Sequence, residues 1–250
     1  MGIKGKIKNK ISRYSNSLGI KSLNRLNLPN ALLIIPDGNG RWAKQKGFPT
    51  EKGHQAGGNT MTKILETFVR LNTKIVGVWA FSEDNWKREK PEIDNIMKVV
   101  KEITEQSLKK MQKYGVRFIV LGKKERIKKE YPQVYKTLEI VQKQTSKNQN
   151  KIFAVFIDYG ERFQLEEFAK ARLEDKTSST YKLLSKINKG LPLFDMILRT
   201  SGEQRISGFG PLACLAEFVT IKKTLPELEV NDIAFALKEY SGRQRRFGGR

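Results

Sequence analysis

The chain has 250 residues, of which 38% are hydrophobic, and its net charge is +22, from 48 Lys and Arg against 26 Asp and Glu. This composition supports a folded core and does not fit a disordered chain, while the single cysteine (Cys214) excludes an intramolecular disulfide and the single histidine (His54) argues against a Cys/His zinc site. No apolar run reaches the roughly 20 residues that a membrane-spanning helix needs, so a cytoplasmic setting is expected.

The positive charge favours an anionic partner, which could be nucleic acid, anionic lipid or a phosphorylated substrate. A lysine-rich proteome would explain the same excess equally well. The segment 1–28 is basic and precedes a predicted domain at 29–250. Its apolar residues recur at helical spacing (Ile3, Ile7, Ile11 and Leu18), which predicts an amphipathic helix that touches an anionic membrane. A solvated tail is an equally good interpretation.

Strand-length apolar segments alternate with helical periodicity along the rest of the chain. We expect strands at Ala31–Pro36, Ile75–Phe81, Val116–Leu121, Lys151–Ile157, Leu193–Leu198 and Ala216–Ile221. We expect helices at 55–72, Pro91–Tyr114, Lys123–Asn150, Gln164–Arg172 and Val230–Arg243. This alternation predicts a single α/β domain with a mostly parallel six-stranded central sheet flanked by helices. Such sheets bind ligands at the carboxyl ends of their strands.

The first expected strand is followed by Asp37-Gly38-Asn39-Gly40-Arg41. Its glycines let backbone amides approach a ligand, and the arginine suits a phosphate group. A carboxylate beside phosphate is consistent only with a divalent cation between them, so Asp37 predicts Mg²⁺. Taken alone, however, an ordinary strand–helix turn explains this spacing better.

Two further segments follow predicted strands. Residues 81–88 combine aromatic, hydroxyl, acidic, amide and cationic side chains. A helix N-cap at Ser82 or Asp84 is the alternative, and it leaves the aromatic rings and the arginine unexplained. Residues 199–209 place two arginines and several hydroxyls around glycines, which suits an anion, with a surface loop as an equal alternative. Neither a P-loop nor a dinucleotide fingerprint is present in the sequence.

In their order and spacing, these motifs resemble the cis-prenyltransferases, the polyprenyl diphosphate synthases that lengthen an allylic diphosphate with isopentenyl units. The resemblance runs from about Leu32 to Gly249. It rests on Asp37–Ala43, Gly47, Gly53-His54-x-x-Gly57, Ala80–Arg88, Asp195–Phe209, Glu217 and Arg245–Gly249.

The resemblance implies a homodimeric enzyme that uses Mg²⁺. Isopentenyl diphosphate would add to a primer such as farnesyl diphosphate, and the Z-polyprenyl diphosphate product would serve as a lipid carrier for glycan synthesis. A hydrophobic product tunnel would hold the growing chain, lined by the expected helices at 55–72 and 91–114.

The resemblance also implies roles for individual residues. The implied catalytic residues are Asp37, Arg41, Ser82 and Asn85. The implied metal ligands are Asp37 and, across a dimer interface, Glu217. The allylic diphosphate would be surrounded by Gly38, Asn39, Gly40, Arg41 and His54, with Trp42 beside them. The incoming isopentenyl unit would contact Phe81, Trp86, Arg88, Arg199, Arg205 and Ser207. Arg246 and Gly248 would reach the neighbouring subunit's site.

Several positions depart from the family pattern. Pro36 replaces a Met, Thr50 an Arg and Asp158 an Asn, and Gly210-Pro211-Leu212 replaces a Trp-Gln segment. Lys52 is a candidate for the charge missing at Thr50, and a weaker affinity for the allylic diphosphate is the alternative. These changes bear on rate and product length, but they remove no residue that the chemistry requires.

Two other functions stay open. A non-catalytic partner subunit of the same fold should lack Asp37 and Arg41, which are both present. A nucleic-acid-binding protein predicts a basic patch interleaved with aromatic residues, and the sequence shows none.

Overall fold

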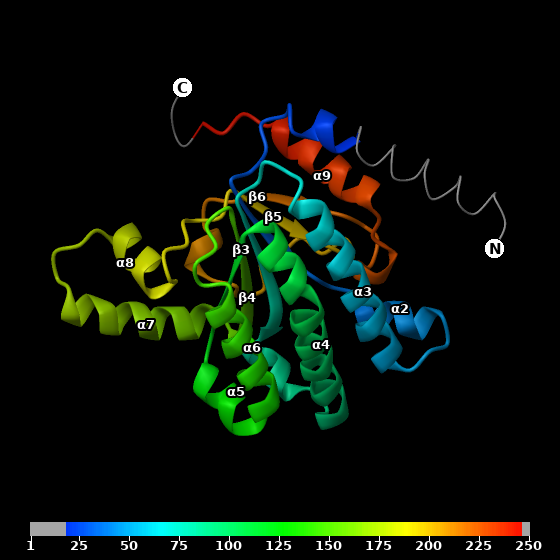
Figure 1. Cartoon of the computed structure of the whole chain (residues 1–250), viewed down its shortest axis with the longest axis horizontal. Helices are drawn as coiled ribbons and strands as arrows, with labels where there is room; N and C mark the ends of the chain where they lie inside the picture. The colour runs from blue at the N-terminus through cyan, green and yellow to red at the C-terminus, as the bar shows by residue number, and fades with distance from the viewer. Residues whose placement is uncertain (1–18, 247–250) are drawn as a thin grey trace.

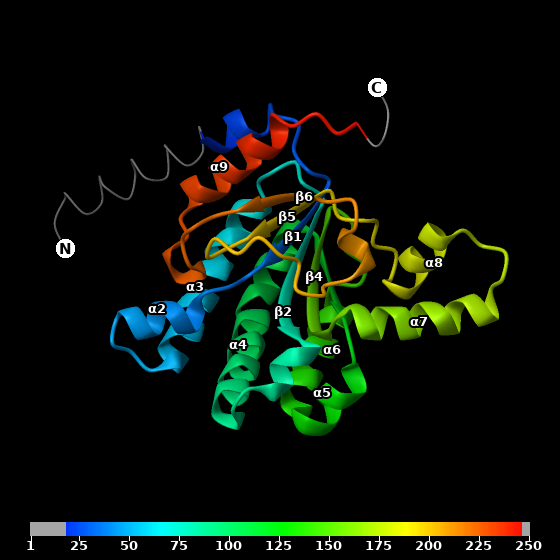
Figure 2. The ribbon, with the colours of Figure 1, turned by 180° about the vertical axis from the view of Figure 1, so that it is seen from behind.

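A parallel sheet runs through the centre of the computed structural model, in which residues 19–246 are described (Figure 1, Figure 2). Its strands are β1 (Ala31–Ile35), β2 (Ile75–Ser82), β3 (Val116–Leu121), β4 (Lys151–Tyr159), β5 (Met196–Arg199) and β6 (Glu217–Thr220). They lie in the order β3-β4-β2-β1-β5-β6, and each pairing is parallel. The predicted six-stranded parallel sheet in one α/β domain is therefore confirmed.

Helices and 3₁₀ turns surround this sheet. The helices are α2 (Asn39–Gln45), α3 (Thr50–Phe68), α4 (Lys90–Tyr114), α5 (Lys124–Glu130), α6 (Pro132–Gln144), α7 (Glu161–Glu174), α8 (Thr180–Ile187) and α9 (Val230–Ser241). The 3₁₀ turns are η1 (Glu83–Lys87), η2 (Pro211–Ala213) and η3 (Leu225–Glu227).

Two hydrophobic clusters form the core, one on each face of the sheet. All five residues of β1 are buried, as a central parallel strand requires. Leu32 and Ile34 face the cluster that includes apolar residues of α3, α4, α6 and α9. Leu33 and Ile35 face the opposite cluster, which includes Phe194 and other residues from 191–213. Successive side chains of β1 therefore pack alternately into the two clusters of the core.

The helices differ from the prediction in several places. Helix α3 begins at Thr50 and ends at Phe68, whereas 55–72 was expected. Helix α2 was not expected, because its seven residues include Gly40 and are too few to show a period. The segment predicted as one helix at 123–150 is divided at Tyr131, since Pro132 cannot continue α5. Helix α8 was not predicted either, although Ser179 caps it through the N–H of Lys182.

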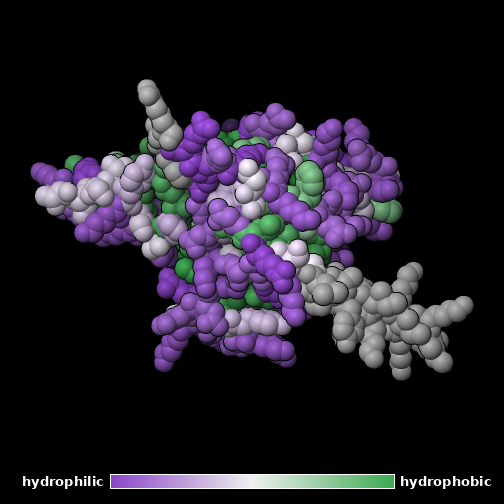
Figure 3. Space-filling model, turned by 90° about the horizontal axis from the view of Figure 1, so that it is seen from above, coloured by the Kyte–Doolittle hydropathy of each residue, from purple (hydrophilic) through white to green (hydrophobic). Residues whose placement is uncertain are grey.

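The first described residues pack against the body of the protein. Residues 19–23 are helical, and Ile20 and Leu23 are buried in the core. The apolar residues 3–18 of the predicted amphipathic helix lie outside the described residues. Figure 3 shows the molecule from the side that bears α9, where polar residues surround small hydrophobic patches. Between residues 19 and 246, no helix is long and apolar enough to cross a membrane.

Candidate functional site

A cavity of about 840 Å³ opens where β1, β2 and β5 end. This is the edge at which parallel α/β sheets bind ligands. One part of the cavity is polar and is lined by Asp37, Arg41, Arg199, Glu203 and Arg205. The part between α3 and α4 is apolar and is lined by Met61, Ile96, Val99, Val100 and Ile103. The cavity therefore matches a ligand with a charged head and an apolar chain.

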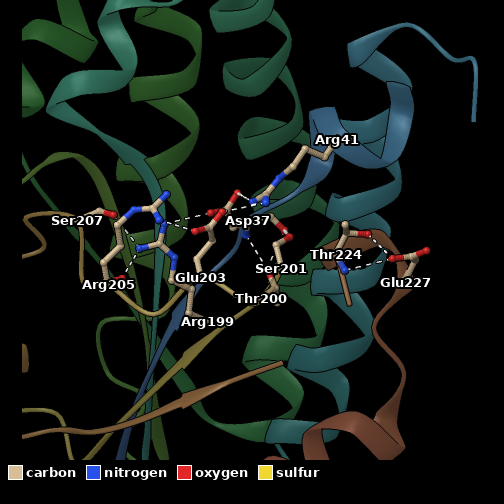
Figure 4. Close-up of polar contacts among 10 residues, drawn as sticks. All are labelled: Asp37, Arg41, Arg199, Thr200, Ser201, Glu203, Arg205, Ser207, Thr224 and Glu227. Carbon is tan, nitrogen blue, oxygen red and sulfur yellow. Dashed lines mark hydrogen bonds and ion pairs between the residues drawn. The ribbon is translucent and has the colours of Figure 1, made fainter. Parts of the chain in front are cut away.

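Asp37 follows β1 and is held by hydrogen bonds at both its backbone and its side chain (Figure 4). Its N–H donates to Thr200 Oγ1 over 2.7 Å, and its carbonyl accepts from the N–H of Leu225 over 3.0 Å. Its Oδ1 accepts from Arg41 over 2.9 Å, and its Oδ2 accepts from Arg199 over 3.0 Å. The loops after β5 and β6 thus fix the position of this carboxylate.

The Asp37 carboxyl is ionised at neutral pH. Burial tends to raise its pKa, but hydrogen bonds from Arg199 and Arg41 outweigh burial and hold the pKa below the ordinary 3.8. The side chain remains 28% exposed, and it faces the cavity. A charged carboxylate is therefore available to a ligand.

Arg199 ends β5 and is the most buried cation of the site, with 5% of its surface exposed. Besides Asp37, it donates to Ser207 Oγ over 2.7 Å and to the carbonyl of Arg205. These contacts hold the loop after β5 against the guanidinium group. Three residues that the sequence assigned to one diphosphate, namely Arg199, Arg205 and Ser207, are thus brought together.

Glu203 joins an arginine of helix α2 to an arginine of the loop after β5 (Figure 4). Its Oε1 lies 2.8 Å from Arg41 Nη1, and its Oε2 contacts Arg205 Nη1. Sequence reasoning placed Glu203 within a motif but gave it no role. The contact with Arg41 could not be predicted, because Arg41 lies far away in the chain.

Glycines allow the segments of the polar end to approach each other closely. Gly38 has a φ of +95°, and a Cβ there would lie 2.0 Å from Ser201 Oγ. A Cβ at Gly57 would lie 2.3 Å from Asn39 Oδ1. Helix α2 begins at Asn39, and no side chain caps it. This geometry agrees with the predicted anion cradle around residues 38–41.

His54 on α3 is buried beside this cradle. Its Nε2 lies 3.3 Å from Glu92 Oε1, and its Nδ1 lies 3.4 Å from Asn39 Nδ2. Glu92 also accepts from Arg88 over 2.6 Å. Burial lowers the pKa of His54 below 6.5, although Glu92 opposes this shift. Glu92 was not identified from the sequence, because its contact with His54 bridges α3 and α4.

Ser82 and Asn85 face the cavity and also cap η1. The N–H of Asn85 donates to Ser82 Oγ over 3.2 Å, and the N–H of Ser82 donates to Asn85 Oδ1 over 3.0 Å. The N-cap alternative for Ser82 is therefore correct about the local structure. Both side chains also line the cavity, together with Arg88, so the cap does not exclude a role in binding.

Phe81 and Trp86 lie behind the cavity lining rather than in it. Their rings meet edge to face with centroids 5.3 Å apart. Arg126 stacks on Trp86 at 4.7 Å and forms an ion pair with Asp158, which is fully buried. These contacts support η1 from below. Arg126 carried no sequence signal, because it lies in a charged helix far from the motifs.

Trp42 and Lys52 are also absent from the residues that line the cavity. Both lie against Phe48, with a ring distance of 5.8 Å for Trp42 and an Nζ–ring distance of 5.0 Å for Lys52. The ammonium group of Lys52 thus lies over the Phe48 ring and outside the cavity lining.

Glu217 and Arg246 lie away from Asp37 within one chain. Glu217 begins β6, whereas the site lies where the neighbouring strand β5 ends. Its carboxylate pairs with Arg243 over 3.0 Å. Arg246 contacts Gln244, and Gly248 lies outside the described residues. The fold therefore does not bring Asp37 and Glu217 together in a single chain.

A divalent cation fits the site only with help from a ligand. Among residues 19–246, no three His, Cys, Asp or Glu side chains are grouped to hold a metal. Asp37 offers one ionised carboxylate at the cavity. Mg²⁺ commonly uses one or two carboxylates together with substrate phosphates, and this donor set matches that pattern.

Comparisons with known proteins all find similarity to prenyltransferases. Residues 35–248 match the family model for undecaprenyl diphosphate synthases. An isoprenyl transferase from Fusobacterium nucleatum is 33% identical over 226 residues, which cover 89% of this chain and 97% of that protein. Among solved structures, lavandulyl diphosphate synthase from Lavandula x intermedia, in complex with dimethylallyl diphosphate, is similar with a TM-score of 0.81 and 26% identity. That match covers 88% of this chain and 98% of the other. A probable undecaprenyl diphosphate synthase from Campylobacter jejuni gives a TM-score of 0.72 and 27% identity, covering 89% and 100%.

Proposed function

This chain belongs to the undecaprenyl diphosphate synthase family of prenyltransferases, and from that premise we propose which reaction it performs. It joins isopentenyl diphosphate to an allylic diphosphate such as farnesyl diphosphate and makes a Z-polyprenyl diphosphate, which serves as a lipid carrier for glycan synthesis. The observation that carries this proposal is the cavity, which is charged around Asp37 and apolar between α3 and α4. Substrate and product share this division between an anionic head and a hydrocarbon chain.

Two groups of residues would hold the two diphosphates. The allylic diphosphate lies at the glycine turn, against the backbone of 38–40, Arg41 and His54. The isopentenyl diphosphate lies against Arg199, Arg205 and Ser207, and Arg199 already contacts Ser207 Oγ and the main-chain carbonyl of Arg205. Asp37 stands between the groups, because it contacts Arg41 on one side and Arg199 on the other. This placement supports transfer between two neighbouring diphosphates.

The chain's own residues promote the reaction by charge and position. The allylic C–O bond breaks and pyrophosphate leaves, the isopentenyl double bond attacks the allylic carbon, and the pyrophosphate takes up the proton that the adduct loses. The arginines stabilise the charge that develops on the departing pyrophosphate. Ser82 and Asn85 orient the isopentenyl unit, since both face the cavity while η1 holds their backbone. Phe81 and Trp86 support η1 from behind and act indirectly.

We assign a Mg²⁺ ion to Asp37 together with the allylic diphosphate. When bound, the ion would neutralise phosphate charge and make pyrophosphate a better leaving group. Asp37 is the carboxylate of the cavity lining that we assign to the ion, and Glu217 of a second copy is the further ligand that we propose. Arg246 and Gly248 of that copy would likewise reach this site, so the proposed active form is a homodimer.

The apolar part of the cavity provides the start of a product tunnel. Gly57, Gly58 and Met61 of α3 face Ile96 and Ile103 of α4 across it. Hydrocarbon displaced from water into such a seam is favoured by about 0.8 kcal/mol for each buried methylene group. The basic segment 1–28 would bring the enzyme to an anionic membrane, where the product partitions.

A direct assay tests this function. The full chain is incubated with Mg²⁺, farnesyl diphosphate and labelled isopentenyl diphosphate, and product lengths are analysed. We expect elongation that stops when EDTA removes the metal. Absence of elongation with farnesyl, geranyl and longer primers would refute the enzymatic proposal. It would favour a non-catalytic partner subunit, although the cavity position of Asp37 and Arg41 argues against that alternative.

A further inference from the structure

Glu203, like Asp37, has a carboxylate that touches an arginine of each proposed diphosphate group. Arg41 belongs to the allylic group and lies 2.8 Å from Oε1, while Arg205 belongs to the isopentenyl group and contacts Oε2. Both arginines are substantially exposed, at 48% and 63% of their side chains, whereas Glu203 is 20% exposed. The carboxylate therefore sits between two cations that face a ligand.

The backbone beside Glu203 is anchored by main-chain hydrogen bonds. The N–H of Ser201 donates to the carbonyl of Lys223 over 2.8 Å, and the N–H of Gly202 donates to the carbonyl of Ile221 over 2.9 Å. These bonds tie the turn to the segment after β6. An arginine side chain is long and can rotate, so an entering phosphate would draw the guanidinium groups away from a carboxylate that stays in place.

A carboxylate in this position competes with phosphate for the same donors. Each guanidinium group offers planar N–H pairs that fit either anion. Hydrogen bonds from Arg205, the main cause, and from Arg41 hold the pKa of Glu203 below its ordinary 4.5, so the group is charged at neutral pH. Asp37 does not compete in the same way, because Arg199 and the proposed metal hold it.

We propose that Glu203 is an internal competitor for the diphosphate-binding arginines, which weakens the grip on pyrophosphate and so speeds its release after each condensation. Glu203 acts through Arg41 and Arg205 and is a positioning residue, not a catalytic one. The inference rests on the proposed function. A polymerising enzyme must expel one pyrophosphate for every unit added, so an arginine site without an internal anion would hold this product too long.

The test is calorimetric titration of the full chain with inorganic pyrophosphate, in EDTA, for the wild type and Glu203→Gln. We expect the variant to bind pyrophosphate about tenfold more tightly, as the loss of one charge-assisted competitor predicts. In the elongation assay, KM for isopentenyl diphosphate and kcat should both fall, because substrate binds better and pyrophosphate leaves more slowly. A residue needed only for folding would not tighten binding.

Two further variants complete the test. Glu203→Asp keeps the charge and should bind pyrophosphate more like the wild type than Glu203→Gln does. Glu66→Gln removes the same charge from an ion pair with Lys110, at the other end of α3, and should leave the affinity unchanged. Equal or weaker binding by Glu203→Gln, tightening by Glu203→Asp to the same degree, or equal tightening by Glu66→Gln would each overturn the proposal.

The two proposals can fail separately. Tighter pyrophosphate binding by Glu203→Gln in a protein that elongates no primer would support the competitor role and refute the proposed reaction. Normal elongation with unchanged pyrophosphate affinity in Glu203→Gln would do the reverse.

Discussion

An aspartate–arginine pair lies at each end of β1, and the two pairs differ in what else the carboxylate contacts. Where β1 ends, the two oxygens of Asp37 accept from Arg41 and Arg199 and face the cavity. Where β1 begins, Asp195 accepts from Arg245 over 2.9 Å with one oxygen, and from the N–H of Ala31 over 2.9 Å with the other. The second carboxylate is thus partly committed to the main chain.

The partners of a carboxylate therefore distinguish a binding role from a structural role, whereas the residue type, aspartate in both cases, does not. The Arg41 side chain is 48% exposed and can turn from Asp37 toward a ligand, and a cation can take its place at that carboxylate oxygen. Asp195 accepts a hydrogen bond from the N–H of Ala31, and this N–H cannot move without displacing a central strand of the sheet. Both residues belong to motifs that resemble the family pattern, so the motif alone does not reveal which role each one has.

Replacing Asp37 should produce the largest effect on turnover. In Asp37→Ala the proposed metal loses its carboxylate, and we expect elongation to fall by at least about 10²–10³-fold, as for other losses of electrostatic stabilisation. The chain should stay folded, because Arg199 keeps its bonds to Ser207 and to the carbonyl of Arg205. Initial rates with labelled isopentenyl diphosphate, beside circular dichroism of the same sample, measure both expectations. Near-normal activity would show that the metal assignment is wrong.

Replacing Asp195 should act mainly on stability. Asp195→Ala leaves the N–H of Ala31 without its acceptor and breaks the pair with Arg245, which should cost about 1–3 kcal/mol of unfolding free energy. Urea unfolding measures this change. The turnover of the folded variant should fall far less than in Asp37→Ala. A larger loss of activity than of stability would contradict the contrast between the two ends of β1.

The regular core of the fold could be predicted from the sequence, because each strand is a short apolar run. All six strands lie where they were expected, although β5 (Met196–Arg199) begins three residues later than Leu193. The predicted strand was too long because Leu193 and Phe194 are apolar. They pack against the core but do not pair with a neighbouring strand. Short helices were harder, since α2 and α8 hold too few residues for a period to emerge.

The candidate site could be predicted only in part. Local motifs indicated Asp37, Arg41 and Arg199, and the structure brings them together. Glu203 and Glu92 gained no role, because their contacts join segments that are distant in the chain. Conversely, Trp42 was included because of a motif, whereas its ring packs against Phe48 and is not part of the cavity lining.

The smallest expected effect concerns the ionisation of His54, which lines the cavity at the end of β1 where Asp37 lies. As the only histidine of the chain, it gives a single imidazole titration in NMR spectra. We expect a pKa below 6.5, because burial disfavours the charged ring. The unfolded chain then takes up the proton first as pH falls below 6.5. The stability due to His54 is therefore present above pH 6.5 and is lost as pH falls through the folded pKa.

Two perturbations give shifts of opposite sign. Glu92→Gln removes the carboxylate that favours the charged ring, so the pKa of His54 should fall further. Pyrophosphate at the cradle brings negative charge close to the imidazole and should raise the pKa. Asp195→Ala should change neither value, since it acts at the other end of β1. If pyrophosphate left the titration of His54 unchanged while it bound to the protein, the anion would lie away from α3, and the assignment of the cradle at residues 38–41 would be wrong.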